Sequence, residues 1–156
     1  MVADYILMRA AGLGMVITQF ELIKHVFIAH GRHLASTGEP LIVDRIEAWK
    51  HGPVIPVLYH ELKIYGDRPI PSLRYCNTPT EKSASRASLF NDVLSKTERD
   101  IIDGVVNDYG DWNMSELYQL CHEDGSPWSQ CYTGEYGVEI PDSVIEAYYK
   151  SEMMVL

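Results

Sequence analysis

The sequence predicts a mainly α-helical protein, a single compact domain of about six to eight helices that spans residues 1–156. Three observations predict this fold class. Apolar residues recur at three- and four-residue steps along most of the chain, which is the spacing of one face of a helix. Four stretches have the capping-box pattern, in which Ser, Thr, Asp or Asn is followed three residues later by Glu. Finally, 156 residues with 46% apolar content fit one ordinary soluble domain.

Two helices are expected in the first part of the chain. A short helix is predicted over residues 4–11, because Gly12 interrupts the pattern that follows. Thr18 and Glu21 form the first capping pattern, and Gly38 marks the end of the long helix that they open. We expect this helix to bury one face, which carries Leu22, Ile23, Val26, Phe27, His30 and Leu34.

The next stretch predicts two short helices joined by a reversal. Asp44 and Glu47 form the second capping pattern, so a helix of one to two turns is expected through Trp49. Gly52 then lets the chain reverse. Pro53 is expected in the first turn of the following helix, where its missing N–H costs nothing.

The remainder of the chain predicts one long irregular segment followed by more helices. Residues 67–94 contain few periodic apolar residues, so a long loop is expected, with a small β-hairpin inside it as an open alternative. The helices after this segment are expected to begin at Ser95, Asn113, Ser126 and Pro141.

The charge of the chain is negative and unevenly distributed. The formal net charge is −9, and residues 1–75 carry eight basic and seven acidic side chains, whereas residues 76–156 carry five basic and fifteen acidic ones. The second half therefore repels phosphate backbones, which disfavours direct binding of nucleic acid. The same field attracts a basic protein surface and speeds the encounter with it. An equally weighted alternative is that these acids simply keep the helices solvated.

Membrane and export signals are not expected. The longest stretch without a charged residue is residues 10–20, whereas a membrane-spanning helix needs roughly 20 apolar residues. Asp4 lies where a signal peptide carries basic residues. The three cysteines cannot all pair with one another, and none forms a CxxC motif, which favours free thiols in a reducing cytoplasm.

The sequence contains no recognisable catalytic or metal-binding pattern. Six histidines are present, but no paired Cys/His motif or HExxH motif accompanies them, so no metal or other cofactor is expected. No Ser lies in a GxSxG turn. Cys121 and His122 are adjacent, but neighbouring helical residues point in different directions and do not form a nucleophile–base pair by themselves. The sequence therefore favours a protein without enzymatic activity.

Two compact motifs combine unusual residues. The first is Trp49-Lys50-His51-Gly52-Pro53 followed by Tyr59, and the second is His122 followed by Pro127-Trp128. On these residues the chain resembles the Panacea domain, the family of SocA-like antitoxins and phage-associated GepA-like proteins. The resemblance covers about residues 20–150. It departs from the family pattern at His25, His51 and Cys121.

The resemblance implies an antitoxin that neutralises a cognate toxin by direct protein–protein binding, with the toxin usually encoded by the adjacent gene. A proteolytic adaptor that delivers the toxin to an ATP-dependent protease is an alternative. A phage-encoded protein that binds a host defence factor is another. The least favoured reading is a small hydrolase that uses His122.

Two sets of residues are candidates for the site. The motif residues are expected to build the fold or to contact the partner, and both roles stay open: Trp49, Lys50, His51, Gly52, Pro53, Tyr59, His122, Pro127 and Trp128. A candidate acidic surface for a basic partner consists of Glu98, Asp103, Asp108, Asp111, Glu116, Glu123 and Asp124.

Overall fold

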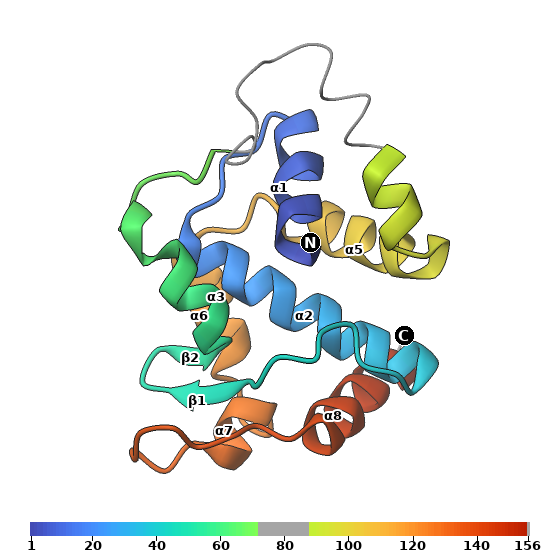
Figure 1. Ribbon diagram of the computed structural model, residues 1–156. Helices are drawn as coiled ribbons and strands as arrows, with labels where there is room; N and C mark the ends of the chain where they lie inside the picture. The colour runs from blue at the N-terminus through green and yellow to red at the C-terminus, as the bar shows by residue number, and fades with distance from the viewer. Residues whose placement is uncertain (72–87, 156) are drawn as a thin grey trace.

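The computed structural model describes residues 1–71 and 88–155 and confirms the mainly helical fold class (Figure 1). Its helices are α1 (Val2–Gly12), α2 (Gln19–Thr37), α3 (Pro56–Leu62), the short 3₁₀ helix η1 (Lys63–Tyr65), α5 (Lys96–Tyr109), α6 (Met114–Cys121), α7 (Pro127–Cys131) and α8 (Asp142–Met154). Residues 88–93 are also helical. The described residues form one two-stranded antiparallel hairpin, β1 (Glu47–Trp49) and β2 (Gly52–Val54). None of the helices in these ranges has the length and apolar character needed to cross a membrane.

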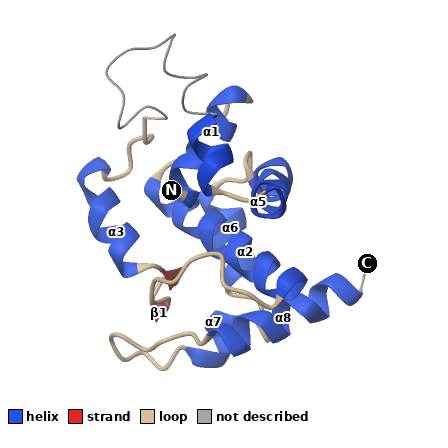
Figure 2. Ribbon diagram, turned by 45° about the vertical axis from the view of Figure 1, so that its right-hand side comes forward, coloured by secondary structure: helices blue, strands red, loops and turns tan. Residues whose placement is uncertain are grey.

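Helix α2 is the centre of the fold. Figure 2 shows α1 and α5 on one side of α2, and the hairpin with α7 and α8 on the other. All residues of the stretch 22–31 are buried. The expectation of one buried face was therefore too narrow, because neighbouring elements pack around the whole circumference of this stretch. A helix in this position holds the other elements in place.

Buried histidines of α2 connect it to distant parts of the chain. The Nε2 atom of His25 lies 3.0 Å from the carbonyl oxygen of Tyr109, at the end of α5. His30 accepts a hydrogen bond from the Ile42 amide at Nδ1, over 3.3 Å. Its Nε2 therefore carries the proton, and it donates to the Asp142 carboxylate at the start of α8, over 2.8 Å. These histidines have structural partners.

Three of the four capping patterns form capping boxes in the structure. In each, the side chain of the N-cap residue faces the backbone N–H of the Glu, and the Glu carboxylate accepts from the N-cap N–H. The boxes begin α2, α5 and α6, and their residue pairs are Thr18 with Glu21, Ser95 with Glu98, and Asn113 with Glu116. The helix starts predicted at these positions are confirmed.

The helix that the fourth capping pattern predicts is wrong. Asp44 and Glu47 do not open a helix, because residues 47–49 form strand β1. The Glu47 carboxylate instead accepts a hydrogen bond from the indole Nε1 of Trp49, over 2.7 Å. The backbone of β1 pairs with β2 on one edge and with residues near Val138 on the other, where the Ala48 amide donates to the Val138 carbonyl over 2.8 Å. Pairing with a distant segment therefore outweighs the local helical signal.

The chain reversal at Gly52 is confirmed, but the role expected for Pro53 was wrong. Gly52 has a φ of +107°, a conformation that residues with a side chain rarely adopt. Pro53 lies in β2, and the following helix begins at Pro56. The hairpin that the structure describes lies at 47–54, and the alternative of a hairpin within 67–94 falls mainly on residues outside the described ranges. Of that segment, residues 88–93 are helical rather than a loop, and residues 72–87 lie outside the described ranges.

Candidate functional site

The two sequence motifs meet at the hairpin, although they are far apart in the sequence. The indole Nε1 of Trp128, on α7, donates a hydrogen bond to the carbonyl oxygen of Trp49 over 2.6 Å. The ring of Trp49 meets the ring of Tyr59 edge-on, with 5.1 Å between the centroids. The motif residues therefore form one site in which α7 and α3 hold the end of strand β1.

A column of rings connects α6 to α7 at this site. The imidazole of His122 stacks on Tyr118 at 3.8 Å and lies 4.0 Å from the ring of Trp128. Trp128 in turn stacks on Tyr132 at 4.6 Å. The Nδ1 atom of His122 is 2.6 Å from the carbonyl oxygen of Tyr118, which makes this nitrogen the protonated donor. His122 thus fills a packing position between two helices.

The neighbouring thiol is not an activated nucleophile. Burial raises the pKa of Cys121 to about 11, so the sulfur stays protonated near neutral pH. Burial also lowers the pKa of His122, which favours its neutral form. This geometry supports the packing role of His122 and gives no support to the hydrolase alternative. In the described part of the chain, no group of three or more His, Cys, Asp or Glu side chains is placed to hold a metal ion.

A lysine of α2 supports the hairpin from inside. Lys24 is 2% exposed, and its ammonium group donates a hydrogen bond to the carbonyl oxygen of Pro53 over 2.7 Å. It also lies over the ring of Phe20, 4.7 Å from the centroid. A Cβ atom at Gly52 would lie 3.0 Å from the Lys24 Nζ and 3.2 Å from His122 Cε1. Gly52 is therefore required both by its φ and by the close approach of these two side chains.

Sequence reasoning missed Lys24 as a site residue. One feature of the sequence could have identified it. Lys24 is the one Lys, Arg, Asp or Glu in the stretch 22–31, and the other side chains of this stretch can all be buried. A single charge in such a stretch has to find a polar partner in the interior.

The burial of Lys24 predicts a pH-dependent stability. Burial lowers the pKa of the Lys24 ammonium from its usual 10.5 to about 8. Between these values the unfolded chain binds more protons than the folded chain, so this group makes the free energy of unfolding rise with pH. We expect the wild type to gain on the order of 1–2 kcal/mol between pH 7 and pH 10 relative to Lys24→Met. Urea unfolding of both proteins across this range measures the difference, and a constant difference would contradict the prediction.

The other motif residues face solvent at the tip of the hairpin. Lys50 and His51 form the two-residue turn between the strands, and both are exposed. His51 lies 6.3 Å from the ring of Tyr118. Tyr136 is 83% exposed, and its ring lies 5.7 Å from that of Trp49. We refer to Lys50, His51, Tyr118 and Tyr136 as the hairpin rim. The motif residues thus divide into a buried or half-buried frame and two exposed turn residues, and Tyr118 and Tyr136 complete the rim beside these two.

Comparison with known proteins assigns the family. The family model described as "Antitoxin SocA-like, Panacea domain" matches residues 22–129, a range that contains every motif residue named above. The chain belongs to the SocA-like antitoxin family. It is 31% identical over 157 residues to a protein of Caulobacter vibrioides named "Antitoxin SocA", and the alignment covers 96% of this chain and 80% of that protein. No solved structure matches the chain.

In this SocA-like chain the predicted acidic surface is divided. Four of its residues interact within the fold: Asp103 pairs with Arg9 and Asp108 with Arg32, each at 2.8 Å, and the other two, Glu98 and Glu116, belong to capping boxes. The remaining three are exposed and form no ion pair with any described residue, namely Asp111, Glu123 and Asp124. These three flank α6, which packs against β2.

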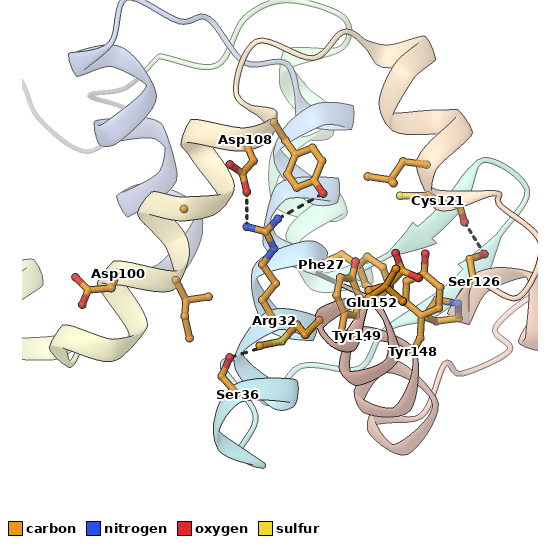
Figure 3. A pocket seen from close by; sticks show the side chains of 17 residues that line it. Phe27, Arg32, Ser36, Asp100, Asp108, Cys121, Ser126, Tyr148, Tyr149 and Glu152 are labelled. Atoms are coloured by element: carbon orange, nitrogen blue, oxygen red, sulfur yellow. Dashed lines mark hydrogen bonds and ion pairs between the residues drawn. The ribbon is translucent and has the colours of Figure 1, made fainter.

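A large cavity lies beside α2, between α5 and α8. It has a volume of about 570 Å³. Figure 3 shows Arg32 extending from α2 toward Asp108, with Phe27 and Tyr149 among the side chains that line the cavity. Asp100 also lines it, so that carboxylates outnumber the single guanidinium. The net charge of the side chains that line this cavity is therefore negative, like the net charge of the C-terminal half of the chain. Pro127, which begins α7, lies at its border.

Proposed function

We propose that this SocA-like protein neutralises a cognate toxin by binding it directly, and that the hairpin rim is part of the contact surface. The family assignment supports an antitoxin role. The observation that carries the proposal is that two separate motifs build one rigid frame and present exposed rings and a lysine on it.

The composition and rigidity of the rim suit a protein–protein contact. Exposed Tyr and His side chains provide large contact areas with few rotatable bonds, and Tyr is enriched among residues that dominate binding energies. The frame is held by the Trp128 indole on one side and by the Lys24 ammonium on the other. A surface that is already ordered loses little conformational entropy on binding.

The unpaired acids near α6 are expected to accelerate the encounter. Asp111, Glu123 and Asp124 lie at the two ends of α6, the helix that carries Tyr118 of the rim. We expect the triple variant Asp111→Asn, Glu123→Gln, Asp124→Asn to associate with a basic toxin roughly tenfold more slowly at low salt. Its association rate should also depend less on ionic strength. Surface plasmon resonance at several salt concentrations measures both effects.

A matched control replaces acids that already have partners within the fold. The double variant Asp100→Asn, Glu146→Gln removes two carboxylates that pair with Lys96 and Lys150. We expect a much smaller change in its association rate. An unchanged rate for the triple variant would overturn the electrostatic part of the proposal.

The test of direct neutralisation uses three readouts in one strain. Neighbouring open reading frames are the first candidates for the toxin, and each is induced with and without this chain. We expect restored growth, copurification of the toxin with the chain, and a toxin half-life that is unchanged or longer. Restored growth with a shortened half-life that depends on an ATP-dependent protease would contradict neutralisation by binding alone and favour the adaptor mechanism. Restored growth without a complex would contradict both mechanisms.

A further inference from the structure

A second cavity lies beside the hairpin, between the start of α2 and the start of α6, and it has the features of a binding site. Its volume is about 300 Å³. The rings of Phe20, Trp49 and Tyr59 supply apolar walls, and Lys24 lines it from α2. Lys50 and His51 line the cavity from the turn of the hairpin. The cavity thus combines flat apolar surfaces with cationic or titratable groups.

The charge of this cavity is opposite to that of the chain. Two lysines line it, with one carboxylate, the exposed Asp67. The larger cavity between α5 and α8 has carboxylates in excess instead, and the whole chain has a formal charge of −9. A local positive charge inside a negatively charged protein favours an anionic ligand at this position.

Lys24 is the strongest sign of a ligand. Its ammonium group has three N–H donors and is almost fully buried, yet among the residues that the structure describes it donates one hydrogen bond, to the carbonyl oxygen of Pro53. No carboxylate among the described residues forms an ion pair with it. Burial of a charge without a counter-charge is costly. A carboxylate that entered the cavity would supply the missing partner.

We propose that this cavity binds a small carboxylate attached to a flat apolar body, with the Lys24 ammonium as the partner of the carboxylate and the surrounding rings packing on the apolar part. A substituted benzoate has this chemistry and is small compared with the cavity. The proposal is independent of toxin binding, because it concerns the chain alone.

The test uses 4-fluorobenzoate, followed by fluorine NMR with the full chain. We expect a saturable shift of the fluorine signal, and no comparable shift with 4-fluorobenzamide, which has the same ring but no charge. Lys24→Met should weaken binding of 4-fluorobenzoate by roughly tenfold or more, because it removes a charge-assisted hydrogen bond. The control Lys96→Met removes an exposed lysine of α5 and should leave binding unchanged. Equal binding of the two probes, or full affinity of Lys24→Met, would overturn the proposal.

A second measurement needs no variant and therefore does not depend on the folding of Lys24→Met. Heteronuclear NMR of the lysine ammonium groups follows Lys24 and Lys96 during a titration of the wild type with 4-fluorobenzoate. We expect the pKa of Lys24 to rise as the carboxylate binds, while that of Lys96 stays constant. A Lys24 signal that does not respond would contradict the proposal.

The carboxylate can belong to a free small molecule or to the toxin, and a competition experiment distinguishes these sources. Lys50 and His51 belong both to the hairpin rim and to the lining of the cavity, so a toxin on the rim can also cover the cavity. Simultaneous binding assigns the cavity to a small molecule. Displacement that is lost when carboxylates of the toxin are replaced by amides places a carboxylate of the toxin in the cavity, and displacement that persists shows that the toxin covers the cavity. The experiments with the isolated chain stand whether or not a toxin binds.

Discussion

Trp128→Ala should lower the free energy of unfolding by about 3–5 kcal/mol, the usual range for removal of a large aromatic side chain from a packed position. The indole stacks on Tyr132, lies against His122 and donates to the carbonyl oxygen of Trp49. Its loss leaves a gap between α7 and the hairpin and removes the hydrogen bond that fixes the end of β1. Urea unfolding followed by circular dichroism measures the change.

Trp128→Phe is the matched control for this substitution. It keeps an aromatic ring in the column but cannot donate to the Trp49 carbonyl. We expect a smaller loss, about 1–2 kcal/mol, which corresponds to a missing hydrogen bond and a small change of volume. If the alanine and phenylalanine variants lost the same stability, the packing role assigned to the indole would be wrong.

Gly31→Ala should destabilise the protein by about 1–3 kcal/mol, although alanine is intrinsically the better helix former. Gly31 lies in the buried middle of α2, and a Cβ atom at this position would overlap the ring of Tyr149 on α8. Tyr149 itself packs edge-on against Phe27, with 6.2 Å between the ring centroids, so its ring has little freedom to move aside. The absence of a side chain at Gly31 therefore sets the distance between α2 and α8.

Gly104 provides a control, because its substitution by alanine is expected to raise the stability of the protein and not to lower it. This glycine also lies inside a helix, but a Cβ atom there would meet only the Arg32 Nη1 atom, at an ordinary contact distance of 3.7 Å. Gly104→Ala should therefore stabilise the protein by about 0.5–1 kcal/mol through helix propensity. Thermal unfolding of both variants checks the pair. Stabilisation by Gly31→Ala would contradict the close packing of α2 against α8.

Local signals were sufficient to place most helices. Ser95 and Asn113 accept hydrogen bonds from backbone N–H groups at helix starts, and the Glu21 carboxylate accepts from the Thr18 N–H. Such contacts lie within a few residues and depend little on the rest of the fold. Ser126 likewise caps α7 by accepting from the Ser129 amide. Helix starts that are fixed by neighbouring residues can therefore be read from the sequence.

Features that depend on distant residues could not be predicted in this way. Glu47 follows Asp44 at capping distance, but the segment forms a strand because it pairs with β2 and with the backbone near Val138. Burial around the whole circumference of residues 22–31 of α2 depends on how α1, α5 and α8 pack, and the apolar spacing of one helix does not reveal this. Local propensity is a weak guide to secondary structure wherever such tertiary contacts determine it.

The candidate site was predicted in part. The motif residues are brought together as one site, in which the rings of Trp49 and Tyr59 are in contact. Lys24 and Tyr136 were missed, because Lys24 reaches the hairpin from another helix and Tyr136 lies in a loop without a distinctive pattern. The acidic residues were identified by charge alone, and charge does not show which of them pair within the fold.

The affinity of the chain for its toxin after substitution of the rim tests the central proposal most directly. The double variant His51→Ala, Tyr136→Ala changes two exposed side chains and should leave the melting temperature nearly unchanged. Isothermal titration calorimetry should then show a loss of affinity of roughly a hundredfold, as expected for two residues that dominate an interface. The control Val43→Ala changes a residue that is 94% exposed and does not belong to the rim, and it should bind like the wild type. Wild-type affinity of the double variant would contradict the assignment of the hairpin rim as the toxin-binding surface.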